Sequence, residues 1–221
     1  MIDEDGRPRG LVWNYDRAEM VLDGAVHVAG LLLGIVGVTV LIALALRSPA
    51  LGSLSISIVY AAGLLAMLGF SAAYNLWPLS RVKWMLRRFD HSAIYLLIAA
   101  TYTPFAAQLK GFAAFALLAW VWSIAAIGIA LKLMLPGRFD RLSILLYLLL
   151  GWSGVMLYEP IIATLSASTL WLLAAGGLLY TAGVVFHLWH SLRFQNAIWH
   201  AFVLGAAACH YSAVLDVLGA T

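Results

Sequence analysis

Long apolar segments alternate with short polar segments along almost the whole chain. A helix needs about 20 predominantly apolar residues to cross a lipid bilayer. Seven segments meet this requirement, and the pattern therefore predicts an all-α bundle of seven transmembrane helices. Their approximate ranges are 24–46, 54–77, 90–109, 112–134, 141–161, 167–189 and 196–218. Six spans is the alternative, because only the segment YEPIIATLSAS separates the fifth range from the sixth.

The composition agrees with a membrane protein and excludes an ordinary soluble domain. Of the 221 residues, 64% are hydrophobic and only 10% are charged, whereas soluble domains are nearer half apolar and a quarter charged. The sequence has no visible internal repeat and no second, soluble domain. We therefore expect residues 1–221 to form a single membrane domain, with residues 1–18 as a polar tail.

The lysine and arginine residues fall mainly on one side of the predicted bundle. Of the 13 such residues, only Arg47 and Lys110 lie in loops on the side opposite the N-terminal tail. Because basic loops remain on the cytoplasmic side of a membrane, the N-terminus is predicted to be cytoplasmic and the C-terminus outside. The net charge of +3 then reflects membrane topology and gives no sign of a nucleic-acid partner.

Polar residues in the predicted spans gather at one depth, near the cytoplasmic ends. Several of them are four residues apart, so they share one face of their helix. They are Glu19, Asp23 and His27 in the first span, Ser71 and Asn75 in the second, Asp90 and His91 in the third, and Asn196 and His200 in the seventh. Ionisable groups are costly inside a membrane and usually serve a function. We therefore expect a water-accessible polar cavity that opens to the cytoplasm.

Each of these residues also has a purely structural interpretation. Glu19 and Asp23 could lie at the start of the first helix, where the helix dipole favours acidic side chains. Asp90 could be the N-cap of the third helix, and Ser71 could hydrogen-bond its own preceding turn. The interpretation as a site therefore rests on the depth that the residues share.

Three motifs built from these residues occur in order along the chain. They consist of Glu19, Asp23 and His27; of Ser71, Asn75 and Asp90; and of Asn196 and His200. In these motifs the sequence resembles the haemolysin III family of bacterial membrane proteins. That family belongs with the progestin and adipoQ receptors, which include the adiponectin receptors. The resemblance implies a seven-helix membrane fold.

In that family the second motif reads Ser-x-x-x-His and the third His-x-x-x-His, and the resemblance implies that the three histidines bind zinc. The corresponding residues here are Asn75, Asn196 and His200. Zinc sites take imidazole, thiolate or carboxylate ligands, so the two asparagines degrade the site. We expect no cofactor, with zinc as the possibility that the resemblance leaves open. The asparagines are instead expected to hydrogen-bond each other, or to reach Asp90 and His200 through water.

The resemblance also implies hydrolysis of an amide in a lipid such as ceramide. Without zinc, the catalytic residues Ser71, Asp90 and His200 would have to activate water themselves, as a His–Asp pair can do by general-base catalysis. A different metal site is a further alternative, although no close sequence spacing supports it. Its candidate ligands are Asp23, His27, Asp90 and His91.

Three functions from different classes follow from these features. We favour a lipid-sensing or membrane-homeostasis protein of the bacterial inner membrane, whose partner is a membrane lipid or fatty acyl chain. The second hypothesis is a lipid amide hydrolase of the ceramidase type, and the third is a pore-forming cytolysin. A pore requires a polar route through the whole membrane, whereas the polar residues here gather at one end.

Three further segments affect the architecture. The loop PLSRVKWMLRRFD mixes basic and apolar residues, so it either lies along the membrane surface or is an ordinary short loop. Pro104 falls inside the third span beside Thr101 and Thr103, where a kink would open a lateral slot for a lipid chain. The small residues of AAGGLLYTAG in the sixth span predict close packing against another helix.

Overall fold

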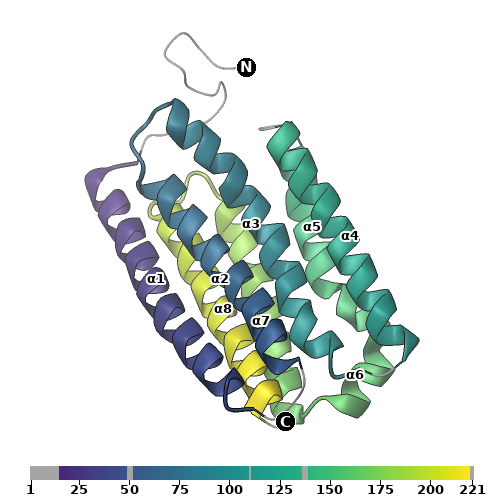
Figure 1. Cartoon of the computed structure of the whole chain (residues 1–221). Helices are drawn as coiled ribbons and strands as arrows, with labels where there is room; N and C mark the ends of the chain where they lie inside the picture. Colours follow the sequence, from purple (N-terminus) through teal and green to yellow (C-terminus); the bar gives the residue numbers. More distant parts are fainter. Residues whose placement is uncertain (1–14, 49–51, 110, 136–138, 220–221) are drawn as a thin grey trace.

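The computed structural model describes residues 15–48, 52–109, 111–135 and 139–219. Within these ranges the regular structure is entirely helical, which confirms the predicted all-α class. The helices are α1 (Arg17–Ala45), α2 (Ser53–Leu76), α3 (Arg81–Ala106), α4 (Phe112–Met134), α5 (Asp140–Trp152), the 3-10 helix η1 (Ser153–Leu157), α6 (Tyr158–Thr164), α7 (Ala167–Leu188) and α8 (Gln195–Gly219). The long helices run side by side as one bundle (Figure 1).

Six segments of the described chain are long and apolar enough to cross a membrane, which supports a multi-pass membrane protein. They are α1, α2, most of α4, the continuous segment from α5 through α6, α7 and α8. α3 has a similar length and runs beside α2 and α4 (Figure 1), but it carries several charged residues in its first turns. The start of α1 and the end of α8 lie at opposite ends of the bundle (Figure 1).

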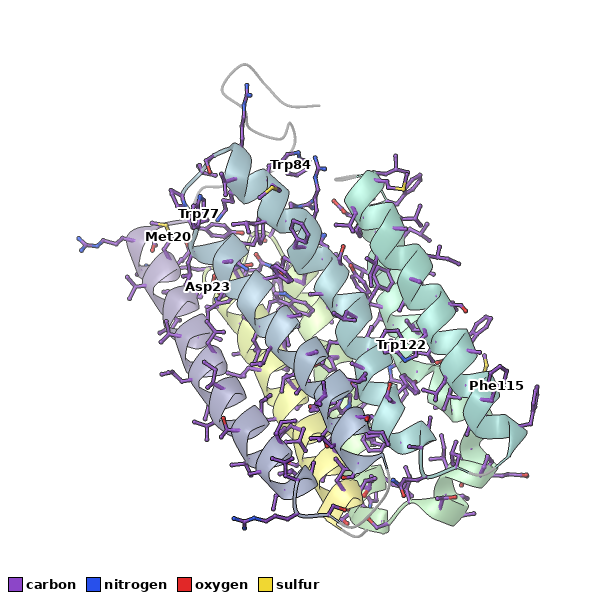
Figure 2. The ribbon with its side chains drawn as sticks, in the orientation of Figure 1. Met20, Asp23, Trp77, Trp84, Phe115 and Trp122 are labelled. Carbon is purple, nitrogen blue, oxygen red and sulfur yellow. The ribbon has the colours of Figure 1, made fainter. Side chains whose placement is uncertain are left out.

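Large apolar side chains cover the outside of the bundle, as expected where lipid replaces water. Figure 2 shows Phe115 projecting outward from α4, and Leu33 of α1 is likewise exposed. Two exposed tryptophans lie at helix ends, Trp77 directly after α2 and Trp189 directly after α7. Tryptophan favours the membrane–water interface, so these positions agree with helices that cross a bilayer.

α3 begins at Arg81, well before the third span that the sequence predicts. The Ser80 side chain caps the helix by accepting a hydrogen bond from the Lys83 N–H at 3.3 Å. Most of the segment PLSRVKWMLRRFD is therefore helix continuous with α3, so its interpretation as an ordinary short loop is wrong. Asp90 lies inside this helix, so its interpretation as an N-cap is also wrong.

The Lys83 side chain joins the start of α3 to the end of α2. Its Nζ donates to the carbonyl oxygens of Tyr74, Asn75 and Trp77 at 2.7, 3.0 and 2.9 Å. The first two carbonyls belong to the last turn of α2 and the third to Trp77 directly after it. The helix dipole is negative at this end, and the carbonyl groups there lack helical partners. The ammonium group thus stabilises the turn that follows the polar residues of α2.

The fifth predicted span is interrupted where α5 gives way to η1. The Tyr102 hydroxyl of α3 accepts a hydrogen bond from the Gly154 N–H at 2.8 Å and donates one to the Gly151 carbonyl at 2.7 Å. Backbone groups freed inside a membrane need such partners. The chain then divides at Ser166, which caps α7 by accepting from the Thr169 N–H at 3.1 Å, so the fifth and sixth predicted segments are separate helices.

α3 lies between two buried apolar clusters and contributes to both. One cluster links it to α1, α2, α7 and α8 around Tyr60 and Val214, and the other links it to α4 and α5 around Tyr95 and Val121. All four of these side chains are at most 1% exposed. α3 therefore fixes the position of α4 and α5 relative to the remaining helices.

Small residues permit the closest helix contacts. A Cβ placed on Gly63 of α2 would lie 2.5 Å from the Cβ of Ala100 on α3. A Cβ on Gly183, in the AAGGLLYTAG segment of α7, would lie 3.0 Å from side-chain atoms of Phe202 and Trp199 on α8. This contact confirms that the small residues of that segment serve helix packing.

Pro104 lies in the last turn of α3, where its side chain is fully buried. The neighbouring Thr103 Oγ1 donates to the Ala99 carbonyl at 3.0 Å and accepts from Trp122 Nε1 of α4 at 3.3 Å. Trp122 lies between the two helices (Figure 2). Thr103 therefore packs against α4 and does not line the lateral slot that the sequence predicts beside Pro104.

Candidate functional site

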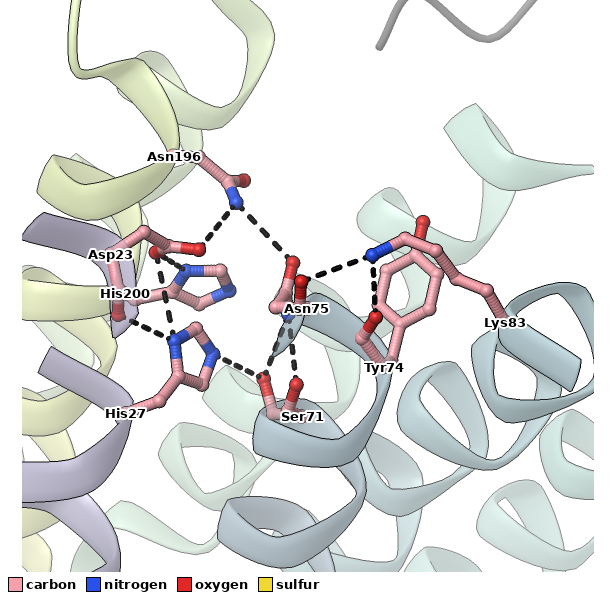
Figure 3. Close-up of polar contacts among 8 residues, drawn as sticks. All are labelled: Asp23, His27, Ser71, Tyr74, Asn75, Lys83, Asn196 and His200. Carbon is pink, nitrogen blue, oxygen red and sulfur yellow. Dashed lines mark hydrogen bonds and ion pairs between the residues drawn. The ribbon is translucent and has the colours of Figure 1, made fainter. Parts of the chain in front are cut away.

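Three neighbouring helices bring six polar side chains together near the end of the bundle where α1 begins (Figures 1 and 3). Each helix contributes two residues that are four apart and therefore project from one face. We call this group the Asp23 cluster. It consists of Asp23 and His27 of α1, Ser71 and Asn75 of α2, and Asn196 and His200 of α8.

The Asp23 carboxylate is the centre of the cluster. Its Oδ1 accepts a hydrogen bond from His200 Nδ1 at 2.6 Å, and its Oδ2 accepts one from Asn196 Nδ2 at 3.0 Å. His27 Nδ1 lies 3.6 Å from the same Oδ1. Asp23 and His27 are each only 7% exposed. A buried carboxylate is thus surrounded by two imidazoles and one amide, an arrangement that membrane proteins seldom keep without a function.

The partners of His27 determine where its proton lies. Nδ1 is 2.8 Å from the backbone carbonyl of Asp23, and a carbonyl oxygen can only accept, so Nδ1 carries the proton. In the neutral ring Nε2 is then an acceptor, and Ser71 Oγ lies 3.3 Å from it. The His27 and His200 rings meet edge to face with centroids 4.2 Å apart. The Ser71 hydroxyl is therefore oriented toward a basic nitrogen.

The two asparagines hydrogen-bond each other, as the sequence predicts. Asn196 Nδ2 donates to Asn75 Oδ1 at 3.3 Å as well as to Asp23, and Asn75 Nδ2 donates to the Ser71 carbonyl at 3.0 Å (Figure 3). The carboxylate that accepts from Asn196 is that of Asp23, a contact that the sequence analysis did not predict. The two amides hold α2 and α8 at a fixed distance beside the Asp23 carboxylate.

Glu19 lies outside the Asp23 cluster and caps α1. Its carboxylate accepts from the Asp16 N–H at 2.8 Å, while the Asp16 carboxylate accepts from the Glu19 N–H at 2.9 Å. The Glu19 N–H, followed by Arg193 at 3.1 Å, holds the pKa of Asp16 below its ordinary value. Glu19 also accepts from the Phe194 N–H at 2.9 Å. The structural interpretation of Glu19 is therefore confirmed, and it joins α1 to the start of α8.

His91 belongs to a second polar group, between α3, α4 and α5, that the sequence analysis missed. Asp140 Oδ2 accepts from Arg87 Nη2 at 2.8 Å, and Oδ1 accepts from Lys132 Nζ at 2.8 Å. His91 Nδ1 lies 3.9 Å from the same Oδ1. In the sequence, Arg87 and Lys132 are two of the basic residues on the side of the N-terminal tail, and they serve only to predict the topology. No sequence spacing relates them, because the three helices meet only in the folded bundle.

Asp90 of α3 lies beside the Asp23 cluster. Its carboxyl group interacts with the Ser71 side chain, and the nearby charges include His200. Of the catalytic candidates, the structure thus brings Ser71 within reach of both His27 and Asp90. His200 contacts Asp23, so the closest His–carboxylate pair is formed by α1 and α8.

Two sets of residues can be compared with the ligand requirements of a metal. Asn75, Asn196 and His200, the positions implied by the family resemblance, include two neutral amides that are already engaged with each other, so they do not fit zinc. Asp23, His27 and His200 do fit by donor type. One ligand atom from each lies within 4.8 Å of the other two, and this group could hold a metal ion.

Comparisons with known proteins agree with this architecture. The family described as Haemolysin-III related matches residues 16–211. The chain is 37% identical over 198 residues to a Hemolysin-3 homolog of Bacillus subtilis (strain 168), covering 89% of this chain and 93% of that protein. It is 36% identical over 198 residues to Hemolysin-3 of Bacillus cereus, covering 89% and 90%.

A more distant similarity reaches animal proteins. Over 175 residues the chain is 30% identical to the monocyte to macrophage differentiation factor of Homo sapiens, which covers 72% of this chain and 69% of that protein. The family match includes the residues of the Asp23 cluster, since all six fall within residues 16–211. The chain therefore belongs to the haemolysin III family, within the progestin and adipoQ receptor superfamily.

Proposed function

We propose that this protein senses a membrane lipid, whose polar group enters the Asp23 cluster while its acyl chain lies among the helices. The observation that carries the proposal is the burial of Asp23 and His27, each 7% exposed, in a bundle whose exterior is apolar. The amides of Asn75 and Asn196 and the ring of His200 provide both donors and acceptors. A lipid amide or hydroxyl group matches these partners, and no metal is required for binding.

We also propose that the chain crosses the bacterial inner membrane seven times, with the N-terminus in the cytoplasm. α3 then provides the seventh span, and its position beside α2 and α4 in Figure 1 supports this role. An odd number of spans also agrees with the placement of the α1 start and the α8 end at opposite ends of the bundle. The Asp23 cluster would lie at the cytoplasmic side, close to the inner leaflet.

The topology can be tested with single cysteines in a Cys209→Ser background. Cysteines replacing Ser80 and Ser191, before α3 and after α7, should be shielded from an impermeant maleimide in intact cells and react after lysis. A cysteine replacing Ser166, before α7, should react in intact cells. Six spans would place the two ends of the chain on the same side, so labelling of a C-terminal cysteine only after lysis would contradict the proposal.

Lipid amide hydrolysis is the second candidate, and one specific contact favours it. His200 Nδ1 lies 2.6 Å from Asp23 Oδ1, so this His–carboxylate pair can act as a general base. The Ser71 hydroxyl, 3.3 Å from His27 Nε2, would have to turn away from that nitrogen to donate to the carbonyl oxygen of an amide. A metal held by Asp23, His27 and His200 would supply a more nucleophilic water.

One experiment separates the two candidates. The purified chain in phosphatidylcholine nanodiscs is given isotope-labelled N-acylsphingosine, and bound lipid and released fatty acid are measured by mass spectrometry. We expect about one lipid per chain in the native protein and at least a tenfold loss of retention in His200→Ala and Asn196→Ala. Thr39→Val, also on α1 but exposed to lipid, should retain it.

Each outcome of that experiment has a defined meaning. Retention of intact lipid supports sensing, whereas release of fatty acid that disappears in His200→Ala supports hydrolysis. Equal lipid retention in the native protein and all three variants would contradict a lipid site at the Asp23 cluster. Circular dichroism and a monodisperse elution profile check that each variant is folded.

A further inference from the structure

We propose that Asp23, His27 and His200 form a binding site for a divalent transition-metal ion, with Asn75 and Asn196 as positioning residues and not as ligands. The inference concerns the metal alone and holds whether the Asp23 cluster binds a lipid or hydrolyses it. It assigns the ligands to α1 and α8, whereas the family resemblance assigns them to α2 and α8.

The donor set is appropriate for such an ion. Two imidazoles and one carboxylate that leave further positions open are a common ligand set for zinc and for non-haem iron. Asp23 and His27 are four residues apart on α1, so both can reach one ion from the same helix face. His200 faces them from α8 (Figure 3).

The distances are close to those of a tetrahedral site. With metal–ligand bonds of about 2.0–2.1 Å, two ligand atoms are about 3.3 Å apart. Asp23 Oδ1 lies 2.6 Å from His200 Nδ1 and 3.6 Å from His27 Nδ1, on either side of that value. Ligation through these nitrogens requires the proton of each ring to move from Nδ1 to Nε2, and His27 Nε2 would then donate to Ser71 Oγ, which lies 3.3 Å away. The three ligand atoms lie within 4.8 Å of one another, so closure on an ion needs only a side-chain movement of about 1.5 Å at the widest pair.

The charge of the cluster also favours a cation. Asp23 carries one negative charge in a setting where its side chain is 10% exposed, and the adjoining side chains of His27 and His200 are 5% and 11% exposed. A metal ion is ligated by neutral imidazoles, so in the metal-bound cluster the ion itself would compensate the Asp23 charge. A divalent ion between the three ligand atoms would neutralise the carboxylate, and buried charges in membranes require such a partner.

The asparagines provide the contacts that normally surround a metal site. Asn196 Nδ2 holds Asp23 Oδ2 at 3.0 Å, which leaves Oδ1 directed at the imidazoles. Asn75 Oδ1 in turn accepts from Asn196 at 3.3 Å. Groups that orient a ligand in this way typically change metal affinity by about 10–100-fold when removed. Replacing either amide should therefore weaken metal binding without abolishing it.

The test uses the full-length chain, purified in detergent, stripped with a chelator and titrated with Zn²⁺ against a chromophoric competitor. Elemental mass spectrometry gives the amount bound. We expect about one zinc per chain in the native protein, a loss of affinity of at least 100-fold in Asp23→Asn and His27→Gln, and a 10–100-fold loss in Asn196→Ala. His190→Gln and Asp216→Asn are matched controls, because both residues lie outside the cluster.

A second measurement does not depend on variants that may unfold. X-ray absorption at the zinc edge of the native protein should show two imidazole ligands and at least one oxygen ligand. The proposal is overturned if the native protein takes up no zinc, if the absorption spectrum lacks imidazole, or if folded Asp23→Asn and His27→Gln proteins bind as tightly as the controls. Loss in Asn75→Ala but not in Asp23→Asn would also overturn it, since the ligands would then lie on α2.

Discussion

Asp140→Ala is expected to destabilise the packing of α3, α4 and α5. The substitution removes the carboxylate that pairs with Arg87 and Lys132, each at 2.8 Å. The Arg87 and Lys132 side chains are only 8% and 4% exposed, whereas that of Asp140 is 37% exposed. Two buried cations from different helices would therefore face each other without a counterion.

The size of the effect follows from this burial. Removing one partner of a buried ion pair typically costs about 3–5 kcal/mol, because the remaining charge is left without compensation. Asp140 itself is partly open to water, which can hydrate the cations once the carboxylate is gone. We therefore expect the lower end, a loss of about 3 kcal/mol. Asp140→Asn keeps an acceptor and should lose about 2 kcal/mol, the value of hydrogen bonds to charged groups.

The free energy of unfolding can be measured by reversible titration of the purified chain from mild detergent into dodecyl sulfate, followed by tryptophan fluorescence. Glu159→Ala is the matched control, since Glu159 is an exposed carboxylate in α6, and its loss should change stability by no more than about 0.5 kcal/mol. The loss of unfolding free energy in the double variant Asp140→Ala/Lys132→Met should be smaller than the sum of the losses in the two single variants. We expect a difference of at least about 1 kcal/mol.

Two results would refute this reasoning. The first is an Asp140→Ala protein whose unfolding free energy lies within about 0.5 kcal/mol of the Glu159→Ala control. The second is strict additivity in the double variant, which would mean that the carboxylate and the Lys132 ammonium do not interact. In either case the ion pairs would be incidental to the packing of α5, and apolar contacts around Tyr95 and Val121 would account for it alone.

Three further predictions concern packing, the broken span and the ligand positions. Gly63→Leu should lower the melting temperature, because the new side chain would separate α2 from α3. Gly69→Leu is the control and should leave the melting temperature unchanged, since no atom lies within 4 Å of a Cβ added there. Equal melting curves for the two variants would contradict the close contact at Gly63. Tyr102→Phe should lower the free energy of unfolding by about 1–2 kcal/mol in the same titration, because the Gly151 carbonyl and the Gly154 N–H lose their partner. An unchanged free energy of unfolding would mean that η1 needs no support from α3. Adding Asn75→His and Asn196→His to an Asp23→Asn chain should restore zinc uptake, measured by elemental analysis, through the family positions; no uptake would show that α2 and α8 do not approach closely enough.

The comparison of sequence and structure is clearest at the polar residues. The spacing of four placed Asp23 with His27, Ser71 with Asn75 and Asn196 with His200, because residues on one helix turn share a face whatever surrounds them. The hydrogen bond between Asn75 and Asn196 was also predicted and is confirmed. These relations need only the helix period and the depth of each residue in the membrane.

The partners across helices could not be predicted in the same way. The bond from Asn196 to Asp23 was not predicted, and only the structure decided that Glu19 caps α1 and does not join the cluster. His91 faces Asp140 and not the Asp23 cluster. A sequence gives the depth of each side chain but not the rotation of its helix about its own axis, and that rotation decides which neighbour the side chain meets.

Helix boundaries show the same limit for a different reason. Ser80 begins α3 earlier than hydrophobicity indicates, because a cap and the Lys83 contacts with the end of α2 stabilise polar helical turns that an apolar window excludes. The break between α5 and η1 likewise depends on the Tyr102 hydroxyl from another helix.

The sequence by itself determined the class of this protein, the approximate positions of its helices and the end of the bundle where polar groups gather. Apolar length and helical period are local properties, so they can be counted along the chain. Only the tertiary structure decided that Asp23 is the centre of the site and that His27 and His200 face it. That choice depends on close contacts such as Gly63 against Ala100, which fix how each helix is turned toward its neighbours.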